Sequence, residues 1–189
     1  MREVPELVLV AVDEPMASAW DGLASVRDSV GAWLRVHRGS VTDLAVDAVV
    51  SPANSFGWMR GGIDGVYARW LPGIEDRVRA AIATEYGGEL PVGQTVIVPT
   101  EAAPPAPAWL ISAPTMRQPG ERLHRSGVAA GLAARAVIRR WRDGVLPDGR
   151  AVREVVGSLA LPGLGTGVGG LSPRVCAQRV AEALDELLG

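Results

Sequence analysis

The sequence contains no lysine and only one cysteine, one asparagine and one phenylalanine in 189 residues. Because all 19 basic residues are arginines, a P-loop, whose lysine contacts the nucleotide phosphates, is excluded. The lone Cys176 cannot form an internal disulfide and has no second thiol with which to share a metal ion. We therefore expect a protein of a reducing compartment.

Long apolar runs and an excess of positive charge are also missing. The apolar segment 7–12 is too short for the core of a signal peptide, and no uncharged apolar run of about 18 residues occurs. The formal net charge of −2 excludes the globally basic surface typical of nucleic acid binding. These absences predict a cytoplasmic protein that does not associate with membranes.

Short β-rich runs alternate with helical patterns along the chain. We predict strands at 7–12, 32–39, 46–52, 94–100, 109–115 and 155–162. We predict helices at 15–30, 62–71, 73–86, 126–142 and 173–188. The length suits one hydrophobic core, and we find no repeat and no linker. The sequence therefore predicts a single α/β domain over 1–189, with helices on both faces of a mixed sheet.

The loop 53–65, which follows an apolar strand, contains the only asparagine of the chain. Ligands of open α/β sheets gather where loops leave the carboxyl ends of strands. The Asn54 amide suits a sugar diol, the Gly61-Gly62 pair lets backbone N–H groups approach a phosphate, and Asp64 can orient or deprotonate a water. Taken singly, Asn54 is more typical of a turn residue and Asp64 of a helix N-cap.

A second loop, GLGTGVGG at 163–170, also follows an apolar strand and precedes a helix. Its glycines permit close backbone approach, and successive N–H groups before a helix form a concavity that suits a diphosphate. The string 165–170 satisfies G-x-G-x-x-G, but no second strand with its acidic residue follows, so the dinucleotide fingerprint is not met. A glycine-rich turn without a ligand is the alternative.

Together the two loops resemble the motifs of the macrodomain family, the ADP-ribose-binding fold, over residues 36–188. The family's V-D-A-I-V-N-A-A-N, glycine stretch and V-D-G correspond to VDAVVSPAN, MRGG and IDG in this sequence. Its P-x-x-x-T-G-x-x-G corresponds to 162–170. The resemblance implies a three-layer α/β/α sandwich with a mixed central sheet.

The resemblance also implies roles for individual residues. Asn54 corresponds to the asparagine that meets the distal ribose, and Asp64 to the carboxylate that MacroD-like hydrolases of the family use around a catalytic water, so these two are the catalytic candidates. No metal and no cofactor are expected. The implied ligand-binding residues are Val41, Ser51, Ala53, Asn54, Phe56, Gly61, Gly62, Ile63, Pro162, Gly163, Gly165, Thr166, Gly167, Val168 and Gly169.

The sequence departs from the family pattern at three positions. Ser40 stands where the family has an acid that binds the adenine amine, and Ser51 replaces the first asparagine of N-A-A-N. Val168 stands where the family often has an aromatic residue that stacks on the distal ribose, and Phe56 or Trp58 is a candidate substitute. These departures point to a substrate that differs from the familiar one in its attached group.

Other reactive side chains are expected to be structural. We interpret His37, His124 and Cys176 as core or surface residues, since none lies in a ligand or catalytic spacing. The arginines at 135, 139 and 142 are expected to form a solvated stripe on one helix face. The polar segment 114–125 either covers the site or lies on the surface.

The sequence therefore predicts a protein that binds ADP-ribose or a derivative and hydrolyses an ADP-ribosyl linkage on a modified macromolecule or metabolite. The expected partner is ADP-ribose or an ADP-ribosylated target, and nucleic acid enters only as a modified substrate. A non-catalytic reader of ADP-ribosylated targets is the alternative. A phosphatase of nucleotide derivatives acting at the ribose end is a third possibility.

Overall fold

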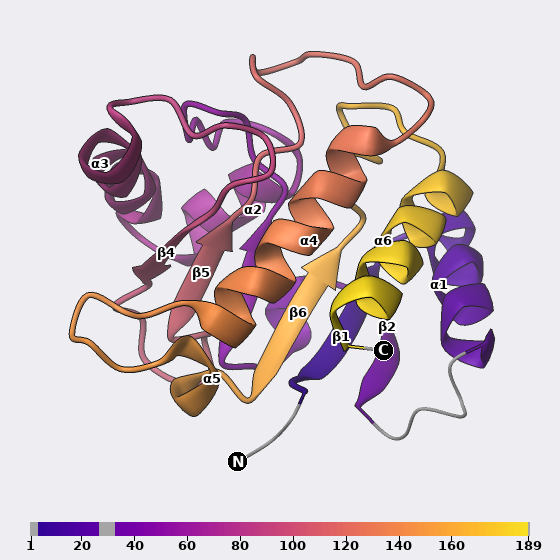
Figure 1. Cartoon of the computed structure of the whole chain (residues 1–189), viewed down its shortest axis with the longest axis horizontal. Helices are drawn as coiled ribbons and strands as arrows, with labels where there is room; N and C mark the ends of the chain where they lie inside the picture. Colours follow the sequence, from indigo (N-terminus) through magenta and orange to yellow (C-terminus); the bar gives the residue numbers. More distant parts are fainter. Residues whose placement is uncertain (1–3, 27–32, 189) are drawn as a thin grey trace.

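A computed structural model describes residues 4–26 and 33–188. Six strands form one mixed sheet in the order β2-β1-β6-β3-β5-β4 (Figure 1). All neighbours are parallel except β4 and β5, which are antiparallel, so the predicted mixed sheet is confirmed. The strands are β1 (Glu6–Ala11), β2 (Leu34–Arg38), β3 (Ala48–Ser51), β4 (Val96–Pro99), β5 (Trp109–Ser112) and β6 (Ser158–Pro162).

The helices lie close to their predicted positions. They are α1 (Glu14–Val26), α2 (Gly62–Trp70), α3 (Ile74–Tyr86), α4 (Val128–Asp143), α5 (Val152–Val155) and α6 (Pro173–Leu188). The expected extension of the first helix over 27–30, and residue 32 of the second predicted strand, lie outside the described residues. Two short helices, α5 and the 3₁₀ helix Val41–Asp43, were not predicted, because neither is long enough to show a helical period. None of the helices in 4–26 and 33–188 is long and apolar enough to cross a bilayer.

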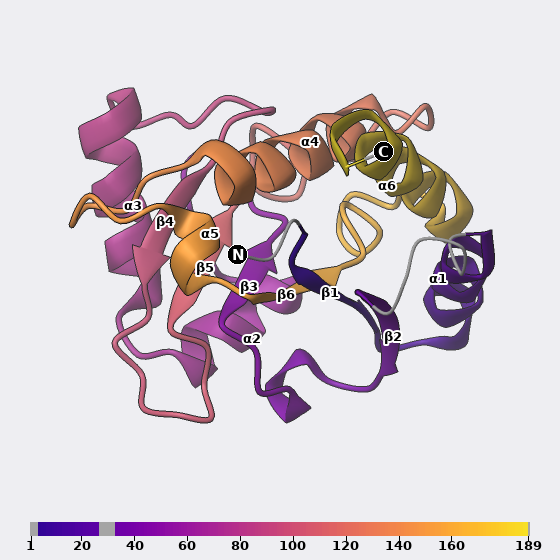
Figure 2. The same cartoon turned by 60° about the horizontal axis from the view of Figure 1, so that its bottom comes forward.

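Helices cover both faces of the sheet. Successive strand residues point to opposite faces, so β1 contributes Leu7 and Leu9 to one core and Val8 and Val10 to the other. The first core includes side chains of α1, α4 and α6, and the second those of α2 and α3. Figure 2 shows α4 and α6 on one side of the sheet and α2 on the other. The predicted three-layer α/β/α architecture is therefore confirmed.

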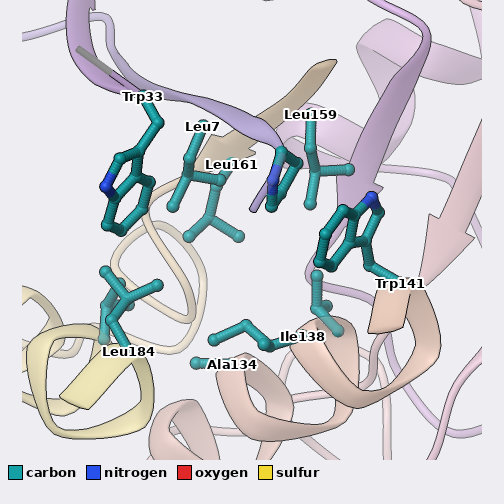
Figure 3. A pocket seen from close by; sticks show the side chains of 11 residues that line it. Leu7, Trp33, Ala134, Ile138, Trp141, Leu159, Leu161 and Leu184 are labelled. Atoms are coloured by element: carbon teal, nitrogen blue, oxygen red, sulfur yellow. The ribbon is translucent and has the colours of Figure 1, made fainter. Parts of the chain in front are cut away.

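A small cavity lies in the first core, between the sheet and the helices α4 and α6. Its volume is about 20 Å³. Trp33 and Trp141 stand on either side of it in Figure 3, and Leu7 and Leu159 approach it from the sheet. The side chains that line it are all apolar. Because such a cavity offers no partner to a polar ligand, it is a packing void rather than a binding site.

The parallel strands bring five loops to one edge of the sheet. Because β1, β2, β3, β5 and β6 point the same way, the loops that follow them leave from the same side. The loops after β5 and β6 lie side by side at the top of Figure 1, where the Leu123 N–H donates to the Gly169 carbonyl over 2.9 Å. The ligand-binding residues predicted from the sequence lie mainly in two of these loops.

Candidate ligand-binding cleft

A cleft of about 1010 Å³ lies at this edge of the sheet. All five loops line it, with residues from 12–13, 40–41, 52–64, 116–120 and 162–169. Following the strand order, the loops after β2 and β1 form one end, the loop after β6 the middle, and the loops after β3 and β5 the other end. The volume is that of a site for a nucleotide-sized ligand.

All but two of the residues that the sequence analysis assigned to the ligand line this cleft. Ser51 lies behind Asp64, to which it is hydrogen-bonded. Phe56 packs instead against Arg117, whose guanidinium carbon is 5.5 Å from the ring centroid. Asp13 also lines the cleft and was not predicted to, although its place directly after the first predicted strand is a usable signal. Other lining residues without a predicted ligand role are Val10, Val12, Met16, Ser40, Pro52, Arg60, Val66, Met116, Pro119, Gly120 and Pro173.

Asn54 organises the loop that carries it. Its Oδ1 accepts hydrogen bonds from the N–H groups of Phe56 at 3.1 Å and Trp58 at 3.3 Å. Its Nδ2 donates to the Trp58 carbonyl over 2.8 Å. An asparagine amide carries two N–H donors, so one is left for a ligand in the cleft that Asn54 lines. The turn role and a ligand-binding role are thus compatible in this side chain.

Asp64 lies in the first turn of α2, buried at the wall of the cleft. Gly61 is the N-cap of this helix, so the interpretation of Asp64 as an N-cap is wrong. The Ser51 hydroxyl donates to Asp64 Oδ1 over 2.6 Å. Burial raises the pKa of Asp64 from 3.8 to about 6, the Ser51 hydrogen bond opposes this rise, and the charge of Glu75 adds to it. Asp64 is therefore a buried carboxyl group that still ionises near neutral pH.

Trp58 supplies an aromatic ring to the cleft. The guanidinium carbons of Arg79 and Arg60 lie 3.6 Å and 4.3 Å from its ring centroid, in cation–π contact. Val168 is also in the lining and is 48% exposed. The chain therefore presents both a tryptophan from the first loop and a valine from the second to the same cleft.

The glycines of the second loop serve two different purposes. A Cβ at Gly165 would collide with Leu123, and one at Gly169 would lie 2.8 Å from the same side chain. Leu123 belongs to the segment 114–125, which therefore packs against the loop, and three residues of that segment line the cleft. At Gly167, by contrast, a Cβ would meet no atom within 4 Å. Gly167 is thus the position where the backbone lies open to the cleft.

The reactive side chains that we expected to be structural have structural partners. The buried Cys176 accepts a hydrogen bond from the Leu164 N–H over 3.2 Å, and burial raises its pKa to about 12. A thiol with a pKa of about 12 is a weak nucleophile. Cys176 is therefore a small core residue, as predicted. His37 also has a partner, since its Nε2 lies 3.1 Å from the Ser40 carbonyl oxygen.

The arginine stripe of α4 is paired with acidic residues. Arg135 and Arg139 both contact Glu186 on α6, at 2.5 Å and 3.5 Å, and Arg142 contacts Asp143 at 2.9 Å. These pairs are half-exposed or exposed, as expected for a solvated stripe. Within residues 4–26 and 33–188 there is no cluster of three or more His, Cys, Asp or Glu side chains that could hold a metal ion.

Comparison with known families identifies the family of this chain. Residues 50–180 match the family model of the Macro domain. The chain belongs to the macrodomain family. The matched segment includes the first loop with Asn54 and Asp64, and the glycine loop 163–170.

Relatives of this macrodomain are found in bacteria. An uncharacterised protein of Aquifex aeolicus is 34% identical over 151 residues, which are 80% of this chain and 80% of that protein. An O-acetyl-ADP-ribose deacetylase of Escherichia fergusonii is 28% identical over 165 residues, with 78% of this chain and 76% of that protein covered. The structure of Thermosipho africanus DarTG in complex with ADP-ribose has a similar fold, with a TM-score of 0.61 and 17% identity, covering 94% of this chain and 50% of that chain.

Proposed function

We propose that this macrodomain binds ADP-ribose and hydrolyses an ADP-ribosyl linkage on a modified macromolecule or metabolite. One observation carries the proposal: a buried carboxyl group with a pKa of about 6, Asp64, lines the same cleft as an open glycine backbone. The Escherichia fergusonii relative, named an O-acetyl-ADP-ribose deacetylase, and the Thermosipho africanus structure, which contains ADP-ribose, support this choice of ligand.

The proposed orientation of ADP-ribose follows the strand order. The end formed by the loops after β1 and β2 is largely apolar and takes the adenine, through residues such as Val12 and Val41. The middle, where Gly167 is open, takes the diphosphate on backbone N–H groups. The other end takes the distal ribose, near Asn54 and Asp64.

In the proposed reaction, Asp64 acts as a general base. Its carboxylate accepts a proton from a water molecule, and the water oxygen bonds to the reacting carbon, which is the anomeric carbon of the distal ribose or the carbon of an ester. The bond to the leaving group breaks with its electron pair on that group, which then receives the proton held by Asp64. Water is the only co-reactant.

Free ADP-ribose is expected to bind, whereas NAD is expected to bind at least about 10-fold more weakly. The nicotinamide of NAD would occupy the distal-ribose end, which is bounded by the Trp58 ring and the buried Asp64. Crowding that leaves polar groups unpaired costs about 1–3 kcal/mol, and 1.4 kcal/mol is tenfold in affinity. Isothermal titration calorimetry with both ligands measures the ratio; equal affinities, or no binding of either, would count against the proposed site.

Asp13 is expected to select the base. Its Oδ1 accepts a hydrogen bond from the Met16 N–H over 2.9 Å, which leaves Oδ2 for the adenine amine. Asp13 would thus replace the acid that the family has at the position of Ser40. Asp13→Asn adds an N–H donor and removes the charge, so the preference for ADP-ribose over its hypoxanthine analogue should fall about 10-fold or more. Calorimetry gives the ratio of the affinities for the two compounds. An unchanged ratio in Asp13→Asn would show that Asp13 does not recognise the base.

Turnover separates an enzyme from a reader module. We expect release of ADP-ribose from at least one class in a panel of ADP-ribosylated proteins, ADP-ribosylated nucleic acids and O-acyl-ADP-ribose. Binding of ADP-ribose without turnover on any carrier would identify a reader module instead. Release of phosphate from a nucleotide derivative would indicate a phosphatase.

A further inference from the structure

Ser51 occupies a position between the sheet and the candidate catalytic carboxylate. It is the last residue of β3, only 1% exposed, and its hydroxyl donates to Asp64 Oδ1 over 2.6 Å. It does not line the cleft, although the sequence analysis assigned it to the ligand. The hydrogen bond links α2, which carries Asp64, to the end of a fully buried central strand.

This hydrogen bond makes the two oxygens of Asp64 different. Oδ1 is held by Ser51, and no other side chain of residues 4–26 and 33–188 donates to the carboxyl group. Since Asp64 lines the cleft while Ser51 lies behind it, Oδ2 is the oxygen left for a water. A carboxylate pinned at one oxygen by a buried donor loses the freedom to rotate about its last bond, which is how preorganised sites are built.

We propose that Ser51 is a positioning residue, which orients Asp64 so that Oδ2 faces the water in the cleft and which does not itself contact ADP-ribose. The inference rests on the proposed hydrolytic function.

The same hydrogen bond sets the pH at which Asp64 becomes a base. Donation from Ser51 lowers the pKa of Asp64, against the larger effect of burial. Two further ionisable groups interact with Asp64: the charge of Glu75 on α3 raises the pKa of Asp64, and the pKa of Tyr67 on α2 is raised by burial and then by Asp64. A general base must be ionised, so removing the Ser51 hydroxyl should move the acidic limb of the rate profile to higher pH.

The neighbouring strand provides a matched control. Ser112 on β5 lies opposite Ser51 in the parallel register and is also fully buried. Its hydroxyl has no hydrogen-bond partner within the described ranges 4–26 and 33–188. Ser112→Ala therefore makes the same chemical change in the same layer without removing a hydrogen bond to Asp64.

The experiment compares Ser51→Ala, Ser51→Thr and Ser112→Ala. For Ser51→Ala we expect kcat to fall by about 10- to 100-fold, since a misplacement of about 1 Å can cost about 100-fold. The acidic limb should lie at higher pH, and the calorimetric affinity for ADP-ribose should be unchanged. Ser51→Thr keeps the hydroxyl and should restore the pH profile. NMR titration of the Asp64 carboxyl in the free protein should show a raised pKa in Ser51→Ala alone, and this readout needs no substrate.

Three results would overturn the inference. An unchanged Asp64 titration in folded Ser51→Ala would show that the hydroxyl does not act on the carboxyl group. Equal losses in Ser51→Ala and Ser112→Ala would show a general packing effect. A loss of ADP-ribose affinity that matches the loss of kcat/KM would make Ser51 a ligand contact. Failure of the unmutated protein to bind ADP-ribose would count against the proposed function, and the NMR titration would still decide the role of Ser51.

Discussion

Asp64→Asn is expected to lower turnover at least about 100-fold, the usual contribution of a general base, while stabilising the fold at neutral pH. An amide of the same shape still accepts the Ser51 hydrogen bond but cannot take a proton from water. Affinity for ADP-ribose should change little, because in the proposed site the backbone N–H groups and Asn54 provide most of the binding. Loss of activity together with a gain in stability is a signature that few substitutions share.

The gain in stability follows from the raised pKa. The folded protein holds Asp64 at a pKa of about 6, against the ordinary value of 3.8 for an aspartate in water, so ionisation is disfavoured by folding. The free energy of unfolding should therefore fall as the pH rises from about 4 through 6, by roughly 3 kcal/mol in the limit set by the shift. Above that range Asp64→Asn should recover about 1–3 kcal/mol, and its stability should vary less between pH 4 and 6.

Urea unfolding of the unmutated protein and Asp64→Asn at pH 4.5 and pH 7.5 measures the change in stability. Single-turnover rates of the same two proteins measure the loss of activity. Asp76→Asn is the matched control, since Asp76 is an exposed acid in the first turn of α3. A surface change of this kind should stay within about 0.5 kcal/mol and leave the rate unaltered. Retained turnover in folded Asp64→Asn would show that Asp64 is not the general base. A lower stability than that of the unmutated protein at pH 7.5 would contradict the raised pKa of Asp64.

Gly167→Glu is expected to lower the affinity for ADP-ribose at least about 100-fold in a protein that still folds. Nothing lies within 4 Å of a Cβ at this position, and the glycine does not have a positive φ, so the substitution is tolerated by the backbone. Its carboxylate would occupy the proposed diphosphate position, where juxtaposed like charges cost several kcal/mol.

Gly22→Glu controls for the change in net charge, because Gly22 lies on α1 outside the cleft and a Cβ there also meets nothing within 4 Å. Gly167→Ala separates shape from charge and should weaken binding far less. Calorimetry with ADP-ribose and circular dichroism on all three variants complete the test. Retained affinity in folded Gly167→Glu would show that ADP-ribose binds elsewhere in the protein.

Much of the fold follows from short apolar segments of the sequence. The predicted runs 7–12, 46–52 and 155–162 contain β1, β3 and β6, whose residues are almost all buried, as is typical of central strands of a covered sheet. The third run was predicted too long, since Val155 ends the helix α5. The last helix was predicted with the bounds that it has, since Pro173 at its first position removes no helical hydrogen bond. Within residues 4–26 and 33–188, the elements that left no periodic signal are the short α5 and the 3₁₀ helix Val41–Asp43.

The two glycine-containing loops could be located from the sequence, but the purpose of their residues could not. Local sequence does not show that Leu123 fills the space at Gly165 and Gly169, because these residues lie more than 40 positions apart and meet only when the loops after β5 and β6 come together. Nor does it show that Phe56 points to Arg117 while Trp58 faces the cleft.

The sequence by itself determined the fold class, the family motifs and the presence of Asn54 and Asp64 in one loop after a buried strand. The tertiary structure decided which side chains face the cleft and which support them. In the folded chain Ser51, which was expected to contact the ligand, donates a hydrogen bond to Asp64 from behind the cleft. Asp13 lies at the opposite end of the site. The physical reason is that propensity and periodicity act over a few residues, whereas burial, and with it the pKa of a carboxyl group, depends on segments that meet only in the folded chain.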